Sequence, residues 1–388
     1  MSSRRNFLKL AGASAGALAA AKLGIKPAVA QGDIPWGDFV RLSQLSWNDL
    51  YGNPPALGRV GQGVVCVNFD GSPAAGLKVF RGPSTSSGIV RKVCAHYVAP
   101  IYAAVRGEPY DARSWSDVWY YIGPNEDGQD EYLHSAFVIP TREVLNQPEE
   151  VTDWFWGEVT VPIAYQFKSP SFNAWYDFDY YKVFYGQVHQ ILESATDDAG
   201  NVWYRIYDDI EPDRPAWVLA QTFRRITPAE FEPINPQVQD KVIEIDLGRQ
   251  TITCLEEGYP VFRTRIASGT VYNAPDGTPI DFSTPYGDYV IQGKRPSRRM
   301  RGGEEFNLAY DVNAVPWVTY FSFTGAAIHG AYWHNNYGVP RSHGCINVTP
   351  DAGKWIYRWS QPYVSYEYVS RLTNEELTDQ PHTPITVI

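Results

Sequence analysis

Three things are scarce in this sequence, and each scarcity argues against a class of protein. Cysteine occurs four times in 388 residues, too rarely for a fold held together by a disulfide framework. There are 33 basic and 43 acidic residues, a formal charge of −10 at pH 7, whereas a nucleic-acid-binding protein needs a basic face. After the first thirty residues, no stretch of 18 uncharged apolar residues occurs, so we expect no membrane span in the mature chain.

The composition favours a mainly β fold. Apolar residues make up 44% of the chain and charged ones 20%, which permits packed cores and excludes global disorder. Aromatic residues reach 14%, with 29 prolines and 32 glycines, and these favour short strands and turns over long helices. The length suits two or three domains of roughly 100–200 residues each.

The first thirty residues read as an export signal. The stretch Ser3–Lys9 (SRRNFLK) precedes an uncharged, Ala/Gly-rich run over 10–21, and Ala28–Ala30 offers the small residues of a cleavage site. The alternative is an amphipathic first helix of the fold. The arginine pair followed by Phe-Leu-Lys resembles a twin-arginine signal. That resemblance implies an exported protein, located outside the cell, in the cell wall or in the periplasm.

Removal of this signal makes the chain more acidic. Residues 1–30 contain five basic and no acidic residues, so 28 basic and 43 acidic residues remain, a net charge of −15. Such a chain repels phosphate polymers and anionic lipid surfaces. We therefore expect a neutral or zwitterionic partner, such as a cell-wall polymer, and no nucleic acid.

A repeated pattern divides the middle of the chain. Residues 119–122 (WYYI) are followed by 132–137, and residues 203–206 (WYRI) are followed at similar spacing by 217–223. Each copy reads as an aromatic strand, an acidic turn and a second strand, which is the pattern of a small barrel. The aromatic cluster 154–156 either stacks on sugar rings or fills an interior and an interface.

The segment 76–87 (GLKVFRGPSTSS) resembles the opening of a bacterial Src-homology-three-like module, and such modules often accompany cell-wall enzymes. We therefore expect two N-terminal β-barrel modules, joined by a Pro-rich linker to a third domain that carries the chemistry. Their predicted bounds are 36–145, 150–232 and 238–388.

The third domain is predicted to be β-rich with one packed helix. Residues 251–255 and 261–266 flank a turn and form a hairpin, and a further strand covers 288–292. A helix begins at Thr349, the N-cap, with Pro350 at the first helical position. Its apolar face is made of Ala352, Trp355, Ile356 and Trp359.

The candidate chemistry lies between His329 and Cys345. This segment of seventeen residues holds one cysteine and three of the seven histidines of the chain. A free thiol with a pKa of ~8.5 is only a few per cent thiolate at neutral pH. A neighbouring imidazole can take the proton and hold an ion pair with the sulfur. Gly344 permits backbone angles closed to other residues, so the amides of Gly344 and Cys345 could hold an oxyanion.

The same residues allow two other interpretations. Cys345 could be a buried structural thiol, although the His, Asn and Gly around it suit a core poorly. A zinc site is the second, made of His329, His334, His343 and Cys345. These residues are separated by five, nine and two positions in the sequence, which matches no common ligand spacing.

The hexad Ser342–Asn347 (SHGCIN), with His329-Gly330 upstream, resembles the signature of L,D-transpeptidases. The similarity covers about 240–365. Membership in this family implies peptidoglycan as substrate, a thioester intermediate, no metal and no cofactor. Papain-like peptidases place the cysteine before the histidine, and sortases need an arginine after the cysteine, so neither family fits.

The resemblance also implies roles for individual residues. Cys345 is the nucleophile, His329 the general base and acid, and the carbonyl of Gly330 orients His329. The oxyanion side is shaped by Ser342, His343 and Gly344. Arg341 departs from the family, whose members usually carry a smaller residue there. Substrate contacts are expected from Gly330, Tyr332, Arg341, Asn347 and Met300, with Tyr310 and Trp317 as further groove residues.

The function that follows is acyl transfer between stem peptides of peptidoglycan, giving a 3→3 cross-link, with carbapenem β-lactams as covalent inhibitors. Two alternatives remain open at this point. An L,D-carboxypeptidase would release the acyl group to water, and a non-catalytic protein would only bind the cell wall. Cys254 is expected to be buried in a strand, and Cys66 and Cys94 could pair in the first barrel, since export favours disulfides.

Overall fold

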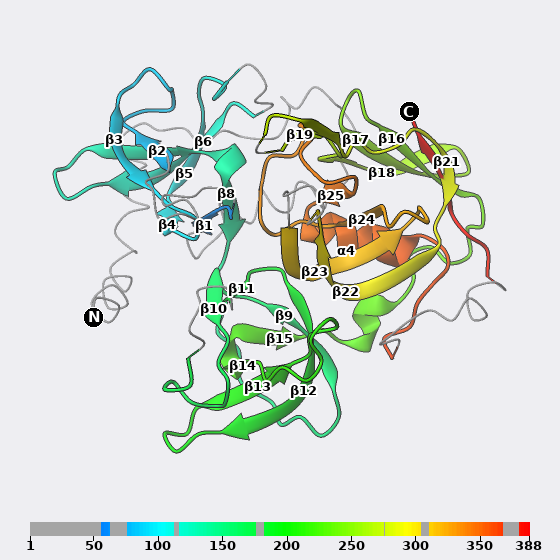
Figure 1. The fold of residues 1–388 in the computed structure, drawn as a ribbon, viewed down its shortest axis with the longest axis horizontal. Coiled ribbons are helices and arrows are strands. Elements are labelled where there is room, and N and C mark those ends of the chain that lie inside the picture. Colours follow the sequence, from blue (N-terminus) through cyan, green and yellow to red (C-terminus); the bar gives the residue numbers. More distant parts are fainter. Residues whose placement is uncertain are drawn as a thin grey trace. The chain divides into compact units, whose positions relative to one another are not determined.

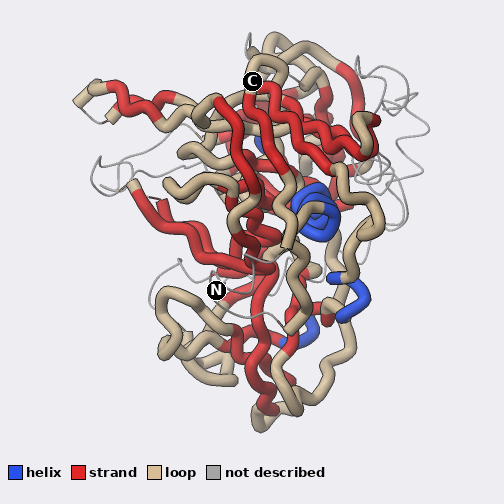
Figure 2. Tube along the Cα trace, turned by 90° about the vertical axis from the view of Figure 1, so that its right-hand side faces the viewer, coloured by secondary structure: helices blue, strands red, loops and turns tan. Residues whose placement is uncertain are grey.

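The structure is a computed structural model that describes residues 56–62, 76–111, 116–175, 182–274, 276–303, 310–367 and 380–388. The predicted export signal lies outside the described residues. Strands dominate (Figures 1 and 2), and α4 (Pro350–Trp359) is the single α-helix in the part that is described. The prediction of a mainly β fold with one packed helix is therefore confirmed. No helix within the described ranges is long and apolar enough to cross a membrane.

Contacts divide the chain into two compact units. The first contains residues 44–142 and the loop 333–336, and the second contains 143–332 and 337–388. Residues of the predicted second module and of the predicted third domain thus share one compact unit. The three domain bounds and the barrel form of the modules stay predictions.

The first unit consists of antiparallel strands in two sheets, ordered β4-β1-β8 and β3-β2-β7-β6-β5. Its buried residues gather in a cluster around Val60, Val79 and Tyr120. The strands are β1 (Ala56–Val60), β2 (Leu77–Phe80), β3 (Ile89–Val93), β4 (Val98–Ile101), β5 (Ala103–Arg106), β6 (Val118–Pro124), β7 (Asp130–His134) and β8 (Val138–Thr141).

The N-terminal part of the second unit repeats a local pattern of the first. There, β6 and β7 pair, and a 3-10 turn (Ser135–Phe137) leads into β8; here β13 and β14 pair, and a 3-10 turn (Ala220–Thr222) leads into β15. One sheet has the order β14-β13-β12-β9-β15, and β10 pairs with β11. The strands are β9 (Phe155–Val159), β10 (Ile163–Tyr165), β11 (Lys182–Phe184), β12 (Val188–Thr196), β13 (Val202–Ile206), β14 (Trp217–Leu219) and β15 (Phe223–Arg225).

The C-terminal part of the second unit holds a five-stranded sheet, β18-β17-β16-β26-β21, and a four-stranded sheet, β22-β23-β24-β25. The predicted hairpin is present as β17 and β18, with Glu257 and Gly258 at φ 50° and 80° in its turn. The strands are β16 (Lys241–Asp246), β17 (Thr251–Glu256), β18 (Tyr259–Arg265), β19 (Val271–Asn273), β20 (Pro279–Asp281), β21 (Gly287–Val290), β22 (Gly293–Gly302), β23 (Tyr310–Tyr320), β24 (Ala327–Gly330), β25 (Ile346–Val348) and β26 (Pro384–Val387).

Helix α4 fixes the position of strands β24 and β25. The side chain of Thr349 accepts a hydrogen bond from the Ala352 amide at 3.3 Å, and Pro350 follows at the first position, as predicted. The helix contacts β23 and β24 (Figure 1). A Cβ on Gly353 would lie 2.9 Å from the Gly330 nitrogen, so a glycine is needed for this close approach. The core joins both sheets and the helix through Ile243, Ile252, Ile328, Ile346, Ala352 and Ile356.

A buried charge network joins β22 to the loop that follows β13. Arg299, 5% exposed, donates to Asp311 on β23 at 2.8 and 2.7 Å, and to Asp208 and Glu211 at 3.0 Å each. A buried guanidinium is tolerated only when it is fully paired. The network therefore attaches this part of the second unit firmly to the four-stranded sheet.

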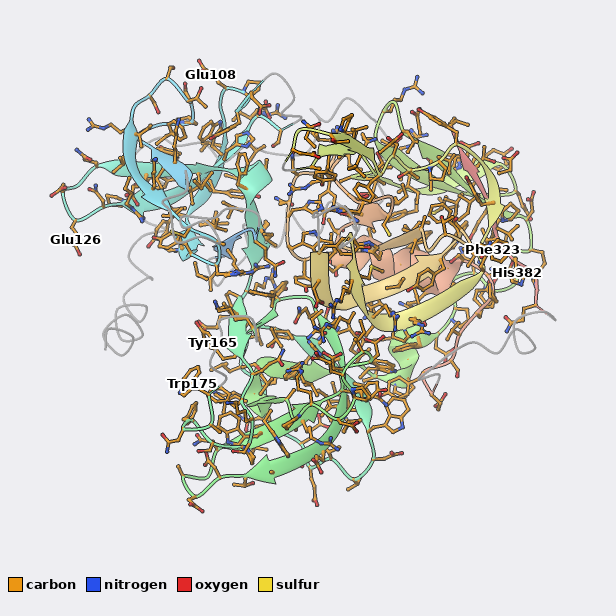
Figure 3. The ribbon with its side chains drawn as sticks, in the orientation of Figure 1. Glu108, Glu126, Tyr165, Trp175, Phe323 and His382 are labelled. Atoms are coloured by element: carbon orange, nitrogen blue, oxygen red, sulfur yellow. The ribbon has the colours of Figure 1, made fainter. Side chains whose placement is uncertain are left out.

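The aromatic residues of the second unit have two different environments. Trp156 is 3% exposed, and its indole nitrogen donates to the Tyr366 carbonyl at 3.0 Å, while Trp154 stacks on the Tyr366 ring at 5.6 Å. Trp175, by contrast, is 51% exposed beside Tyr165 (Figure 3). The cluster 154–156 thus packs inside the unit, which corresponds to the second of the two interpretations given for it.

Candidate active site

The proposed nucleophile and base lie on neighbouring parallel strands. Strands β24 and β25 pair with His329 opposite Asn347, and Cys345 comes directly before β25. Side chains two residues apart on a strand project from the same face of a sheet. Cys345, Asn347 and His329 therefore share one face, while Ile328 and Ile346 point into the core on the other.

The turn before Cys345 has the backbone that the sequence predicted. Gly344 has φ 107°, and a Cβ placed there would meet nothing closer than the Phe282 carbonyl oxygen at 3.7 Å. The requirement for glycine is therefore the left-handed backbone itself and not lack of space. The Ser342 hydroxyl donates to the carbonyl of Cys345 and accepts from the Gly344 amide at 3.2 Å, so it closes the turn from inside.

A second segment holds this turn from outside. The Thr284 hydroxyl donates to the Gly344 carbonyl at 2.9 Å and accepts from the Gly269 amide at 2.9 Å. A Cβ on Gly269 would lie 2.0 Å from the Phe282 carbonyl oxygen and 2.9 Å from the Gly344 Cα. Thr284 and Gly269 are thus site residues that the sequence analysis did not identify, because their partners are remote in sequence.

His343 is held by aromatic rings. Its imidazole stacks on Tyr272 at 4.6 Å with an interplanar angle of 9°, and it lies 4.7 Å from the Phe282 ring and 4.8 Å from the Tyr310 ring. Burial lowers the pKa of His343. The side chain is therefore a neutral wall of the site, and Tyr310, predicted as a groove residue, forms part of the same wall.

His329 is buried, with both ring nitrogens engaged. Nδ1 lies 3.1 Å from the Gly330 carbonyl oxygen, as the resemblance implied, and Nε2 lies 3.2 Å from Nδ2 of Asn347. Since a carbonyl only accepts, Nδ1 carries the proton, and Nε2 accepts from the Asn347 amide. Burial lowers the pKa of His329 to about 4, against the opposing effect of the Gly330 carbonyl. The imidazole is therefore neutral at pH 7 and can act as a base.

The thiol of Cys345 is also neutral. Burial raises its pKa to about 11, and a hydrogen bond with the Ala327 backbone lowers it by a smaller amount. Burial thus opposes the predicted thiolate–imidazolium pair, which stays a prediction. The reason is desolvation, which penalises both charged partners and cannot be read from the motif.

The expected substrate contacts fall into two groups. Arg341 lies next to the turn, where its carbonyl accepts from the Tyr272 hydroxyl, and Met300 lies on β22 opposite Val312. Tyr332, by contrast, is 2% exposed, with its hydroxyl 2.6 Å from the Asn313 carbonyl. Trp317 packs against Phe231 and Tyr357, so the expectation that it lines a groove is wrong.

Tyr320 is a site residue that the sequence analysis missed. It lies on β23 opposite Ala327, and burial raises its pKa. Its place in a long apolar strand gives no local signal of function. Ala327 pairs with Tyr320 and lies level with Cys345, so the register places Tyr320 and Cys345 on one face of the sheet with β24 between them.

The cysteines of the described residues differ in their bonding. Cys94 is disulfide-bonded, Cys254 and Cys345 are free, and Cys66 lies outside the described residues. Cys254 is fully buried, as expected. Within the described ranges, no group of three or more His, Cys, Asp or Glu side chains is placed to hold a metal ion.

Comparisons with known proteins give the same family as the motif. Residues 240–386 match the YkuD family model, the L,D-transpeptidase catalytic domain. The L,D-transpeptidase 2 of Mycobacterium tuberculosis (strain CDC 1551 / Oshkosh) is 24% identical over 124 residues, which cover 29% of this chain and 29% of that protein. The chain thus matches less than a third of that relative's length.

Solved structures of L,D-transpeptidases also match this chain. The catalytic domain of the Enterococcus faecium enzyme is 26% identical, covering 39% of this chain and 98% of its own, with a TM-score of 0.27. The same domain acylated by ertapenem is 25% identical, covering 38% and 97%, with a TM-score of 0.27. The Mycobacterium smegmatis enzyme is 17% identical, covering 50% and 98%, with a TM-score of 0.29. Residues 240–386 thus match the model of the L,D-transpeptidase catalytic domain, the family that the motif at Ser342–Asn347 resembles.

Proposed function

We propose that this protein is an exported peptidoglycan L,D-transpeptidase in which Cys345 is the nucleophile and His329 the general base and acid. The observation that carries the proposal is the parallel pairing of β24 with β25 inside the matched domain, since it gives Cys345 and His329 a common face. The acidic mature chain and the twin-arginine-like leader support action on the cell wall, outside the cytoplasm.

In the first half-reaction, Sγ of Cys345 attacks the carbonyl carbon of the third residue of a donor stem peptide. The thiol proton passes to Nε2 of His329, the C–S bond forms, and the C–N bond to the terminal D-alanine breaks. His329 returns the proton to the leaving amine. Because thiol and imidazole are both neutral at rest, proton transfer accompanies attack and does not precede it.

The oxyanion that forms in this step needs main-chain donors. The amide of Cys345 and the amide of Gly344 are the candidates, and the left-handed turn at Gly344 presents them together. The Gly344 amide donates to the Ser342 hydroxyl at 3.2 Å in the resting structure. The developing oxyanion would take the place of the Ser342 hydroxyl as the acceptor of the hydrogen bond from the Gly344 amide.

In the second half-reaction, an acceptor side-chain amine attacks the thioester while His329 takes its proton, and the new amide bond is the 3→3 cross-link. Water in place of the amine would make the enzyme an L,D-carboxypeptidase. A carbapenem would acylate the same sulfur through its strained carbonyl, as ertapenem has acylated the Enterococcus faecium domain.

The test is incubation of the mature protein with disaccharide-tetrapeptide, followed by mass analysis of the products. Cross-linked dimers support the proposal, and release of tripeptide alone supports the carboxypeptidase. Unchanged substrate, together with no mass shift of the protein after carbapenem treatment, would contradict both and leave a wall-binding protein.

A further inference from the structure

Three aromatic side chains of the segment 165–175 lie at the surface of the second unit. Tyr165 is 42% exposed, Phe172 is 45% exposed and Trp175 is 51% exposed, and the rings of Tyr165 and Trp175 are in contact (Figure 3). Single exposed apolar side chains are common on proteins, whereas adjacent ones mark a surface that binds something. These three side chains, the outer rings, therefore form a candidate binding site.

Two buried rings hold the outer rings in place. The centroid of the Phe167 ring lies 4.5 Å from that of Trp175 and 5.8 Å from that of Phe172. The Trp203 ring lies 4.9 Å from that of Phe172 and 5.0 Å from that of Phe167. Phe167 is 3% exposed and Trp203 is fully buried. The interior is thus already filled by the two inner rings, and the outer rings are ordered before any ligand binds, which lowers the entropic cost of binding.

The backbone of this segment is hydrogen-bonded as well. The Lys168 amide donates to the Ala174 carbonyl at 2.8 Å, which closes the loop between them. At its base, the Phe167 amide donates to the Trp217 carbonyl at 2.8 Å, and the Trp217 amide donates to the Phe167 carbonyl at 2.9 Å. The outer rings are therefore presented by a closed loop that is attached to β14.

The outer rings form a corner and not a flat surface. The centroids of Tyr165 and Trp175 are 5.7 Å apart, and their planes make an angle of 70°. A sugar ring that lies on the face of one therefore meets the other at its edge. The C–H groups on the face of a sugar are attracted by the negative face of an aromatic ring, while its hydroxyl groups point outward and need polar partners.

The polar side chains beside the outer rings are mostly uncharged. Lys168 is the one charged residue in the sequence between Ile163 and Trp175. Asn173 is exposed, and among the described residues its side-chain amide has no hydrogen-bond partner. An amide both donates to and accepts from hydroxyl groups. Aromatic rings with a few uncharged polar groups suit a neutral ligand that is rich in hydroxyl groups.

Charge argues against nucleic acid, which also stacks on aromatic rings. Single-stranded nucleic acids require a positively charged groove for their phosphates. Residues 31–388 instead carry a net charge of −15. The glycan chain of a cell-wall polymer has no phosphates, and its sugar rings present C–H faces. Charge and ring geometry thus favour a glycan as the occupant.

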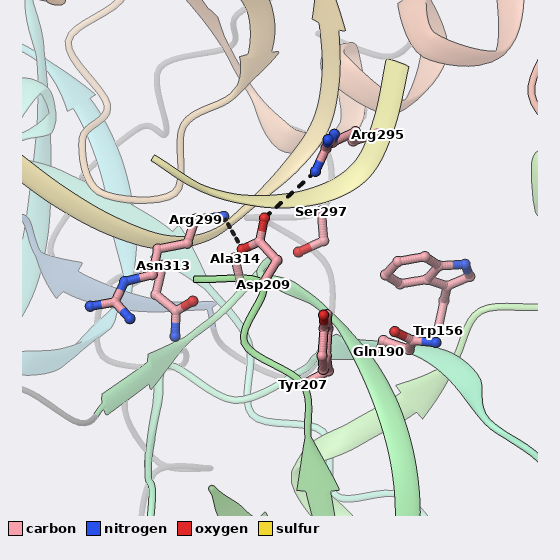
Figure 4. A pocket seen from close by; sticks show the side chains of 9 residues that line it. All are labelled: Trp156, Gln190, Tyr207, Asp209, Arg295, Ser297, Arg299, Asn313 and Ala314. Carbon is pink, nitrogen blue, oxygen red and sulfur yellow. Dashed lines mark hydrogen bonds and ion pairs between the residues drawn. The ribbon is translucent and has the colours of Figure 1, made fainter. Parts of the chain in front are cut away.

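The cavity beside the four-stranded sheet is a weaker candidate (Figure 4). Its volume is about 30 Å³, and because one water needs roughly 10–15 Å³, it holds about two waters and no sugar ring. Its charged side chains are paired, since Arg295 and Arg298 both contact Asp209, and Arg299 belongs to the buried network. Nothing at this cavity calls for a ligand.

We propose that the outer rings bind the glycan chain of peptidoglycan by stacking on its sugar rings. The inference rests on the proposed function for the identity of the polymer. It adds a second site, in the N-terminal part of the second unit, whereas Cys345 lies in the C-terminal part. The second site holds the polymer while one of its stem peptides reacts.

The first test measures the affinity of the mature protein for a soluble, uncharged hexasaccharide of N-acetylglucosamine, by calorimetry. We expect saturable binding in the parent and a Kd at least about tenfold higher in Trp175→Ala or Tyr165→Ala, as expected for the loss of one stacking contact. Trp175→Phe keeps a ring and should retain part of the affinity. Tyr259→Ala, which removes an aromatic side chain that is 75% exposed in β18, should retain all of it.

The second test compares the rate of reaction on insoluble peptidoglycan with the rate of acylation by a sugar-free tetrapeptide. The ratio of the first rate to the second should fall at least about fivefold in Trp175→Ala, because only the polymer carries the glycan. The ratio in Tyr259→Ala should equal that of the parent.

Three results would overturn the inference while the proposed function stands. They are absence of saturable binding of the hexasaccharide, equal affinity in the parent and in Trp175→Ala, and binding of a proline-rich peptide in place of the hexasaccharide, which would make the outer rings a site for another protein. Absence of a thioester with the tetrapeptide would instead contradict the proposed function, and hexasaccharide binding would still be measurable. The two failures are therefore distinguishable.

Discussion

The two free thiols in the part of the chain that the structure describes, Cys254 and Cys345, lie in opposite kinds of site. Cys254, in the middle of β17, is fully buried and has Ile243 and Phe262 as its cross-strand neighbours. Cys345 follows a left-handed glycine and shares a face with His329. Burial raises the pKa of both thiols. A shifted pKa therefore does not mark the reactive cysteine; the polar groups within its reach do.

The largest effect expected from this comparison is loss of acylation in Cys345→Ala. Because the proposed thioester forms on the Cys345 sulfur, acylation by carbapenem or tetrapeptide should fall by on the order of 10⁴ or more. Cys254→Ala is the matched control and should acylate at the parental rate. Intact-mass spectrometry follows both reactions. Acylation that persists in Cys345→Ala would show that another group is the nucleophile.

The two thiols should also differ in how their rates of alkylation depend on pH. With its pKa at about 11, Cys345 should react with iodoacetamide about tenfold faster for each unit of pH, over roughly 10³ between pH 7 and pH 10. Cys254 should stay unmodified until the protein unfolds. A flat rate between pH 6 and pH 9 would instead show a preformed thiolate–imidazolium pair.

His329→Gln should slow acylation by about 10³, within the range typical of a lost general base. In the parent, the acylation rate should fall as the pH drops through about 4, because protonation of His329 then removes the base. His329→Gln should lack this acid limb of the pH–rate profile. His382→Gln, which changes a histidine that binds the Ile291 carbonyl far from the motif, is the control. An unchanged acid limb in His329→Gln would assign the base to another group.

Gly344→Val should slow acylation by about a hundredfold, because a β-branched residue cannot hold φ 107° and the amides of the turn move. Gly258→Val places the same strain in the β17–β18 turn, where a Cβ meets nothing within 4 Å, and should acylate normally. Parental rates in both variants would contradict the oxyanion geometry.

Asn347→Ala should have the smallest effect, about tenfold on acylation, through a less well-positioned imidazole. Its amide donates to Nε2 and so favours the neutral ring. The acid limb of the rate profile should therefore move upward from about pH 4. Asn235→Ala, which removes a surface contact with Glu256, should leave the limb in place. If Asn347→Ala is slower but its acid limb stays at the same pH, Asn347 does not act on the pKa of His329 and has only a structural role.

The parts of this molecule that were predictable from sequence are those with local signals. The cap at Thr349, the turn at Glu257-Gly258 and the hexad Ser342–Asn347 each lie within a few residues of the feature that they specify. The helix behind the site followed from such signals, whereas the two strands that carry His329 and Asn347 were not predicted.

The parts that were not predictable depend on partners far apart in sequence. Arg299 meets Asp208 across 91 positions, and Tyr320 reaches Cys345 only through the pairing of three strands. The effect of burial on the pKa values of Cys345 and His329 was also not predictable, because the sequence shows which groups are adjacent but not how far burial excludes water from them. Trp317 was misplaced for a related reason: its strand has two faces, and the motif does not tell which one packs on α4.

The most direct test of the account is to trap the acyl-enzyme with disaccharide-tetrapeptide, digest it, and map the mass of the acyl group onto a peptide. The account predicts the tripeptide acyl mass on the fragment that contains Cys345, with free D-alanine in equal amount and unmodified Cys254. An adduct on any other residue, or D-alanine release without a thioester, would contradict it.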